Sequence, residues 1–349
     1  MCRYREMVEM VFSEPLVRPR FTEKGNHCNG QAFSIGCLSV GENRLVCVTS
    51  GNSYLGSHMV KQLLAHGYLV RVTIQNPVDY EDMRRLIEDE DMNKLENVVV
   101  AKMQDLDSLC NAFSGCHAVF HTSSFIDPHG ITGYSQQTAI LEADAAQNVM
   151  EACGSAENVK RCIFTSSLLA SIWIAQNPNR VIDEGCWSNE EFCRDRKLWL
   201  ALGKTVAEKA AWRKSKELKL KLVTICPGLL MAPSFPRAHK ESSVPYLKGS
   251  LAMLQRGVLA TADVKKVAEA HVHVYKAMDN GACGRYLCFN RVVQKFDEVI
   301  QIENELGMHS LLCGGRIGVS TEETHNSNLS NSRLTKLLLQ ASQRKSCKG

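Results

Sequence analysis

The sequence predicts an α/β fold in which a doubly wound parallel sheet is joined to a smaller C-terminal lobe. Between residues 45 and 227, six short apolar runs alternate with segments of helical period. A glycine-containing turn follows the first run, and the regular alternation stops at Pro227. Strands that alternate with helices in this way form right-handed βαβ units, and helices cover both faces of the resulting sheet.

Each element is predicted from its local pattern. Apolar runs predict strands at 45–49, 68–74, 97–101, 118–122, 161–165 and 220–225. Helical spacing of apolar residues predicts helices at 55–66, 80–91, 106–113, 137–153 and 198–218. After Pro227 the pattern predicts helices at 246–256 and 263–278, and a short apolar helix at 334–339.

These elements divide the chain into four parts. Residues 1–42 show no sustained period and are interpreted as a loosely ordered leader. Residues 43–231 form the predicted sheet domain. Residues 232–313 form the smaller lobe, from which the helix at 263–278 returns to the main body. Residues 314–349 are rich in Ser and Asn and are interpreted as a polar tail.

Composition and charge argue against several classes of protein. Lys and Arg (41) exceed Asp and Glu (37) by four over 349 residues, and this excess is too small to favour a nucleic-acid-binding surface. The sequence contains no run of about eighteen apolar residues that could span a membrane. We therefore expect neither nucleic-acid nor membrane partners.

The cysteines and histidines do not form a metal-binding pattern. The 15 cysteines are odd in number and include no C-x-x-C pair, so neither a disulfide framework nor structural zinc is predicted. We interpret them as small core residues in a reducing, cytoplasmic setting. His271 and His273 are two residues apart on a predicted helix and point apart, so no metal site is expected.

A glycine-containing turn connects the first predicted strand to the first helix. Such a turn lets the backbone approach a pyrophosphate, which then lies on the helix N-terminus, as in Rossmann-type dinucleotide-binding folds. The residues expected to contact the dinucleotide are Ser50, Gly51, Ser53, Tyr54, Leu55 and Gly56. The motif alone is also compatible with an ordinary strand, turn and helix that bind no ligand.

Several sequence blocks between Gly115 and about Gly307 resemble those of one enzyme family. They are Thr165-Ser166-Ser167, Asp183–Trp187, Lys197–Lys204, Ala207–Trp212 and Val267–His271. In these blocks the chain resembles the plant cinnamoyl-CoA reductase-like proteins, and most closely the branch linked to plant defence. Those proteins are extended short-chain dehydrogenase/reductases of the NAD-dependent epimerase/dehydratase family. The resemblance implies a nicotinamide cofactor, NADP or NAD, and a small-molecule phenylpropanoid substrate.

The resemblance assigns catalytic roles to three positions. The family uses a tyrosine and a lysine four residues apart on one helix, with a serine that hydrogen-bonds the substrate carbonyl. Lys204 and Ser167 match the lysine and the serine, with Ser166 as a near alternative, whereas Leu200 occupies the tyrosine position. Leucine has no proton to give, and the same predicted helix contains no tyrosine. Catalysis is therefore expected to be slow.

The resemblance also marks cofactor contacts. The family's turn has three glycines, and Ser50 and Ser53 stand at two of those positions. The family's arginine for the 2′-phosphate of NADP corresponds to Gln75, which leaves the choice between NADP and NAD open. Further contacts are implied at Thr122, at Lys204, and at Pro227 and Leu230, in a loop over the nicotinamide.

Two hypotheses about function remain. The first is an NAD(P)-dependent oxidoreductase that transfers hydride to a carbonyl or thioester group and is impaired by Leu200. The second is a catalytically inactive nucleotide-binding or scaffold protein of the same fold, which the changes at Ser50, Ser53 and Gln75 favour. An epimerase or dehydratase ranks last, because those enzymes use the same tyrosine. The sequence sets no oligomeric state, and a monomer is consistent with it.

Overall fold

The computed structural model describes residues 44–122, 134–174, 181–231, 245–306 and 328–346. The described residues all belong to one compact unit, which spans residues 43–349. The predicted leader at 1–42 lies outside the described residues, as does the part of the predicted tail at 314–327.

Seven parallel strands form the main sheet. In spatial order they are β3 (Asn97–Val100), β2 (Leu69–Ile74), β1 (Leu45–Val48), β4 (Ala118–His121), β5 (Arg161–Thr165), β6 (Lys221–Pro227) and β9 (Gly284–Cys288). All neighbouring strands are parallel, and Val46 of β1 pairs with both Val70 of β2 and Ala118 of β4. The strand order reverses between β1 and β4. Open α/β sheets bind ligands at such a point, outside the carboxyl ends of the strands.

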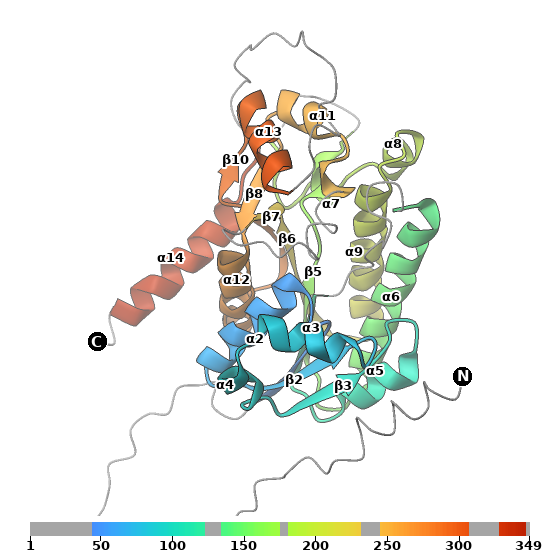
Figure 1. The fold of residues 1–349 in the computed structure, drawn as a ribbon, viewed down its shortest axis with the longest axis vertical. Helices are drawn as coiled ribbons and strands as arrows, with labels where there is room; N and C mark the ends of the chain where they lie inside the picture. Colours follow the sequence, from blue (N-terminus) through green and yellow to red (C-terminus); the bar gives the residue numbers. More distant parts are fainter. Residues whose placement is uncertain (1–43, 123–133, 175–180, 232–244, 307–327, 347–349) are drawn as a thin grey trace, which may run out of the picture. The chain divides into compact units, whose positions relative to one another are not determined.

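Helices cover both faces of the main sheet (Figure 1). On one face lie α2 (Tyr54–Ala65) and α12 (Val264–Ala277); on the other lie α5 (Leu106–Phe113), α6 (Gln136–Ser155) and α9 (Trp199–Glu217). Strand β1 serves both cores, because Val46 and Val48 are buried with α2 and α12, whereas Cys47 is buried with α5, α6 and α9. The sequence therefore predicts a doubly wound sheet correctly.

A second sheet of three strands has the order β10 (Arg291–Val292), β8 (Ala260–Asp263) and β7 (Leu229–Met231). Around it, α11 (Ser250–Gln255), α13 (Phe296–Glu305) and the 3-10 turn η2 (Pro245–Leu247) share one apolar core with α7 (Leu169–Ile172) and α8 (Glu190–Asp195). A further 3-10 turn, η3 (Met278–Asn280), follows α12. This core forms the smaller lobe.

The six predicted strands are all present, within two residues of their predicted bounds, but two predicted helices are divided. The helix expected at 80–91 is two helices, α3 (Asp79–Leu86) and α4 (Asp89–Met92). Between them Ile87 adopts an extended conformation (φ −113°, ψ 128°) and its side chain is buried. The helix expected at 246–256 is interrupted at Gly249, whose φ of 88° is left-handed.

Strand β9 is absent from the sequence prediction, which placed residues 284–288 in the smaller lobe. Its residues run parallel to β6 and complete the main sheet. The strand could not be predicted from the sequence, because the charged Arg285 interrupts the apolar pattern. In the structure its side chain is nevertheless buried. Helix α14 (Ser332–Ser346) is longer than the predicted helix at 334–339 and packs against α12 and β9.

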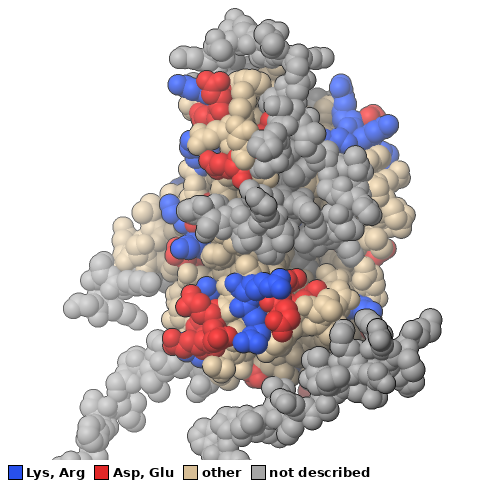
Figure 2. Space-filling view, viewed as in Figure 1, with Lys and Arg blue, Asp and Glu red and all other residues tan. Residues whose placement is uncertain are grey.

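Charges of both signs lie side by side over α3 and α4, in the lower part of the view in Figure 2. Within this group Arg85 pairs with Asp82, and Arg84 pairs with Asp89. The ten cysteines of the described residues are all free, and eight are buried, as their interpretation as core residues predicts. None of the helices described combines the length and the apolar character needed to cross a membrane.

Candidate active site

Buried polar side chains gather at the carboxyl ends of β1, β4 and β5. They are Thr49, His121, Thr122, Thr165, Ser166 and Ser167. The hydroxyl oxygen of Thr49 lies 3.1 Å from Nδ1 of His121 and accepts a hydrogen bond from the backbone N–H of Thr122. The Thr122 hydroxyl in turn donates to the backbone oxygen of Thr49. These bonds hold β1 and β4 together where the strand order reverses.

The turn after β1 is closely packed against its neighbours. Ser53 caps α2, and its hydroxyl oxygen accepts a hydrogen bond from the backbone N–H of Gly56 at 3.0 Å. A Cβ on Gly56 would lie 2.3 Å from the backbone oxygen of Ser50, and a Cβ on Gly51 would lie 2.1 Å from Cγ1 of Val72. Both glycines are therefore needed for the turn to pack against α2 and β2.

Ser50 adopts a backbone conformation that favours glycine. Its φ is 51°, in the left-handed region where a Cβ costs about 1–2 kcal/mol. The backbone N–H of Ser50 donates to the Thr73 hydroxyl at 3.3 Å, which fixes the turn to β2. The structure thus agrees with the expectation that a serine here replaces a glycine.

The N-terminus of α2 fits a dinucleotide. The helix has 12 residues, and its first turn, which begins with Tyr54 and Leu55, carries no acidic residue. The positive end of the helix dipole and the closely packed glycine turn therefore suit a pyrophosphate. These features support the predicted cofactor contacts at 50–56, which stay predictions.

The end of β2 lacks the predicted family arginine and has an acidic neighbour. Gln75 and Asn76 both donate their backbone N–H groups to the carboxylate of Asp79, at 3.2 Å and 2.9 Å. Arg71 of the same strand does not serve this end, because its guanidinium pairs with Glu96 at 2.8 Å. Gln75 therefore offers an uncharged amide at the position that the resemblance assigns to the 2′-phosphate.

Lys204 lies in a buried ion pair with Glu142 of α6. Its ammonium nitrogen is 3.3 Å and 3.2 Å from the two carboxylate oxygens. The Tyr134 hydroxyl donates to the same carboxylate at 2.9 Å. Burial, and after it the charge of Lys204, lowers the pKa of His121 to about 4. The charge of Lys204 therefore acts on His121, at the carboxyl end of β4.

Leu200 lies one helical turn before Lys204 and is half-buried against the core of the smaller lobe. It lines a small cavity of about 20 Å³, which is room for about one water molecule. The cavity is also lined by Tyr134, Leu169, Trp173, Leu198, Trp199, Ala201, Pro245 and Lys248. The predicted tyrosine position therefore faces a pocket that leucine does not fill completely.

The two candidate serines have different partners. The Ser166 hydroxyl donates to the Glu208 carboxylate at 2.7 Å, in the interior. The Ser167 hydroxyl oxygen accepts from the backbone N–H of Leu169 at 3.2 Å, and its own proton is not used in that bond. The bonds described therefore use the hydroxyl proton of Ser166 and leave that of Ser167 available to a substrate oxygen.

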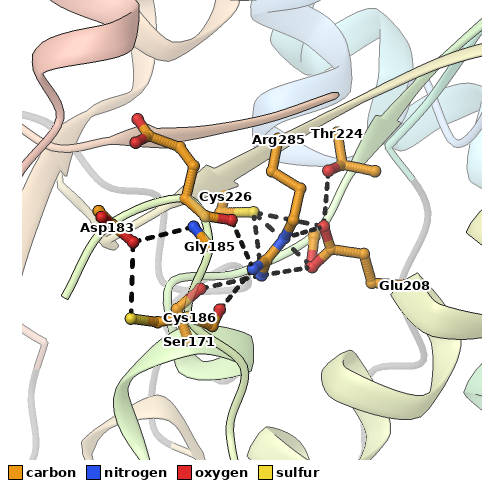
Figure 3. Close-up of polar contacts among 10 residues, drawn as sticks. Ser171, Asp183, Gly185, Cys186, Glu208, Thr224, Cys226 and Arg285 are labelled. Atoms are coloured by element: carbon orange, nitrogen blue, oxygen red, sulfur yellow. Dashed lines mark hydrogen bonds and ion pairs between the residues drawn. The ribbon is translucent and has the colours of Figure 1, made fainter. Parts of the chain in front are cut away.

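Glu208 belongs to a buried network that the sequence does not reveal (Figure 3). Its carboxylate accepts from the guanidinium of Arg285 at 2.8 Å and 3.1 Å. Arg285 also donates to the Ser171 hydroxyl at 2.9 Å and lies 3.7 Å from the ring centre of Trp187. The network joins α9, α7, β9 and the segment at 183–187, and through Ser166 it reaches the end of β5.

A match to a family model identifies the protein family of this chain. The family model for the 3-beta hydroxysteroid dehydrogenase/isomerase family matches residues 47–223, which is more than half of the chain and contains the end of β1, all of β2 to β5, Lys204 and both serines. The chain belongs to this family.

The curated proteins to which the chain is similar include several plant reductases. The chain is 38% identical to cinnamoyl-CoA reductase 1 of Petunia hybrida over 73% of its length and 75% of the relative. It is 38% identical to cinnamoyl-CoA reductase 1 of Arabidopsis thaliana over 70% of each chain. It is 30% identical to the bifunctional dihydroflavonol 4-reductase/flavanone 4-reductase of Pyrus communis, over 71% and 72%. These matches confirm the resemblance to the cinnamoyl-CoA reductases, whereas the link to plant defence stays a prediction.

The solved structures of two reductases share the fold of this chain. Vestitone reductase from alfalfa (Medicago sativa) has a TM-score of 0.60 at 24% identity, covering 84% of this chain and 91% of that one. Yeast methylglyoxal/isovaleraldehyde reductase, solved with NADPH, has a TM-score of 0.64 at 20% identity, covering 84% and 92%. The Rossmann-type fold is thereby confirmed.

Two residues that were predicted to contact the nicotinamide from a loop lie elsewhere in the structure. Pro227 and Leu230 do not lie in a loop: Pro227 ends β6 and pairs with Cys288, while Leu230 is in β7 and pairs with Ala262. The chain passes between them at Gly228, where a Cβ would lie 2.6 Å from a backbone oxygen of β8. The two residues therefore lie in two strands, β6 of the main sheet and β7 of the second sheet, where the sequence suggests one loop.

The histidines of α12 have separate environments. His271 is fully buried, and its ring nitrogens lie 2.9 Å from the Thr165 hydroxyl and 2.8 Å from the backbone oxygen of Val267. His273 instead meets the ring of His66, with centroids 6.1 Å apart. They point apart, as the spacing predicts.

Proposed function

We propose that this protein is an NAD(P)-dependent reductase of the cinnamoyl-CoA reductase kind, with a slow chemical step. The observation that carries the proposal is the buried ion pair of Lys204 with Glu142, in a fold whose first βα turn suits a cofactor pyrophosphate. The plant reductases that align with most of the chain support the same reading. The substrate class would be a phenylpropanoid carbonyl or CoA thioester, in a cytoplasmic and defence-related setting.

Each retained residue has a role in this proposal. A bound nicotinamide would supply the hydride. The residues at 50–56 would hold its pyrophosphate, and Thr122 and Lys204 would lie along its ribose. The Ser167 hydroxyl would donate a hydrogen bond to the substrate oxygen and stabilise the negative charge that forms there. The Lys204 ammonium would stabilise the same charge through space.

Leu200 explains why the chemical step would be slow. A positioned general acid contributes roughly 10²–10⁴-fold to proton transfer, and leucine contributes nothing of this kind. The cavity beside Leu200 admits about one water molecule, so the position is open to a larger side chain.

The decisive experiment compares Leu200→Tyr with Leu200→Phe. Reduction of feruloyl-CoA would be followed through NADPH consumption. We expect Leu200→Tyr to raise kcat by about 100-fold, whereas Leu200→Phe, which adds the ring without the hydroxyl, leaves kcat near that of the wild type. If neither variant exceeds the wild type, this assignment of the acid position is wrong.

A specific observation also favours the second candidate, a nucleotide-binding scaffold without catalysis. Leu200 packs against the apolar core of the smaller lobe, so the fold itself does not need a tyrosine there. Under this alternative the protein binds NADPH or NADH with a measurable Kd, yet Leu200→Tyr turns over no CoA thioester or aldehyde.

A further inference from the structure

Tyr134 brings a phenol to the cavity beside Leu200. It precedes α6 in the chain and lines the cavity, although 66 residues separate it from Leu200. A Cβ on Gly203 would lie 3.0 Å from the Tyr134 hydroxyl, so that hydroxyl rests directly against α9, next to Lys204. A tyrosine from a different segment thus reaches the helix whose own tyrosine position is occupied by leucine.

The phenol is connected to Lys204 through one carboxylate. Tyr134 donates to Oε1 of Glu142 at 2.9 Å, and the Lys204 ammonium donates to the same atom at 3.3 Å. All three side chains are buried. The arrangement is a short chain of hydrogen bonds from an ammonium, through a carboxylate, to a phenol. Such a chain can pass a proton toward the cavity.

We propose that Tyr134 is a less effective proton donor that partly replaces the tyrosine absent at position 200, so that the step is slow but not without an acid, and that Glu142 and Lys204 resupply its proton. The proposal rests on the proposed function, because it concerns the proton that accompanies hydride transfer.

The proton balance is as follows. As the carbonyl carbon accepts hydride, the π electron pair of the carbonyl bond moves to oxygen. The O–H bond of Tyr134 breaks and the proton moves to that oxygen. A proton then passes from the Lys204 ammonium through the Glu142 carboxylate to the phenolate, and water reprotonates Lys204. With a thioester, the hemithioacetal expels the thiol, and the proton on oxygen leaves with the sulfur.

The electrostatics agree with a donor role. Burial, and next the charge of Glu142, raises the pKa of Tyr134 well above its ordinary value. The phenol therefore stays protonated at neutral pH, which is the state that carbonyl reduction needs. An alkoxide formed from a carbonyl is a stronger base still, so transfer from the phenol remains favourable.

Lys248 is the other residue on this cavity that carries a transferable proton. Its ammonium donates to the backbone oxygen of Lys197 at 2.7 Å, and the residue is exposed. No bond described in the structure joins it to Lys204 or Glu142. Lys248→Met therefore serves as the rival variant.

The test is a double-mutant cycle with wild type, Tyr134→Phe, Leu200→Tyr and the double variant. The readouts are kcat for feruloyl-CoA with NADPH, the Kd of NADPH by protein fluorescence, and Tm. We expect Tyr134→Phe to lower kcat by about 100-fold in the wild type but by less than about threefold in the Leu200→Tyr background, where a second phenol is supplied. The Kd of NADPH should be unchanged throughout. Tyr275→Phe, which removes a buried phenol on α12, is the matched control and should leave kcat unchanged.

A readout without cofactor tests the Glu142 connection. In the unliganded protein, Glu142→Gln removes the negative charge beside the phenol. The chemical shifts of the Tyr134 ring at neutral pH should then differ from those of the wild type, because the phenol loses a charged hydrogen-bond acceptor. Unchanged Tyr134 shifts would mean that Glu142 and Tyr134 are not coupled, which would overturn the relay.

Three activity results would overturn the proposal. The first is an equal loss from Tyr134→Phe in both backgrounds, which indicates a structural role. The second is full kcat in Tyr134→Phe with loss in Lys248→Met. If Leu200→Tyr is active and wild type shows no turnover, the Tyr134 donor fails while the proposed reductase stands. If no variant binds NADPH or NADH, the proposed function itself fails.

Discussion

The guanidinium of Arg285 lies 2.8 Å from the carboxylate of Glu208, and both side chains are almost completely buried. The pair joins the last strand of the main sheet to the helix that carries Lys204. It also holds Ser166, next to the candidate catalytic serine. The geometry of the site therefore depends on an ion pair outside it.

Removing one partner of this ion pair should destabilise the protein strongly. Arg285→Met leaves the Glu208 carboxylate buried without its cation, which costs about 3–5 kcal/mol of unfolding free energy. Chemical denaturation measures the loss. Arg285→Met combined with Glu208→Gln should cost clearly less than the sum of the two single changes. Arg85→Ala, at an exposed pair, should leave stability unchanged.

The two serines of the glycine turn should respond with opposite signs. Ser50→Gly relieves a positive φ and should raise the free energy of unfolding by up to about 1 kcal/mol. Ser53→Ala removes the cap of α2 and should lower it by about 1 kcal/mol. Thermal or denaturant unfolding distinguishes them. A loss of stability in Ser50→Gly would contradict the strain argued from this backbone conformation.

The choice between NADPH and NADH should depend on position 75. Gln75→Arg places a cation at the end of β2, and a charge-assisted bond to the 2′-phosphate is worth about 1.5–3 kcal/mol. We therefore expect the ratio of NADH to NADPH dissociation constants to rise about tenfold or more. Gln75→Met, which is uncharged and of similar length, should not change that ratio. An equal effect of both substitutions would rule out the electrostatic explanation.

Two buried histidines should make stability fall in acid. Burial lowers the pKa of His121 and of His271 to about 4, from an ordinary value of 6.5. The unfolded chain therefore binds more protons than the folded one between these values. The stability that each neutral histidine contributes is complete above pH 6.5 and is lost as the pH falls toward 4. This lowers the free energy of unfolding by at most about 3 kcal/mol for each histidine.

His271→Gln tests this assignment. Glutamine does not titrate in this range and can keep a polar contact to Thr165. The unfolding free energy of wild type and His271→Gln would be measured at pH 7 and pH 5. The variant should lose less stability than the wild type over that interval. The same loss in both would show that His271 does not titrate on unfolding.

The local elements were predictable because their signals are local. Leu45–Val48 is a short apolar run, and the glycine turn follows it directly, so the first βα unit could be predicted from the sequence. Positions 200 and 204 are one helical turn apart, and the replacement of the expected tyrosine could be seen without coordinates.

What escaped prediction depends on contacts between distant residues. Arg285 conceals strand β9, because its charge is neutralised by a residue 77 positions away. Tyr134 reaches Lys204 only because α6 and α9 pack together, and Glu142 lies in a helix without a motif of its own. The sequence pattern of a single segment contains neither relationship.

Binding of the nicotinamide cofactor tests the central claim most directly. Purified protein would be titrated with NADPH and NADH, followed by its own fluorescence, beside Gly56→Ala and the neighbouring control Ser57→Ala. A Cβ at position 56 would collide with the backbone oxygen of Ser50. We predict saturable binding to the wild type and to Ser57→Ala, weakened about tenfold or more in Gly56→Ala. Failure of the wild type to bind either nucleotide would contradict the account.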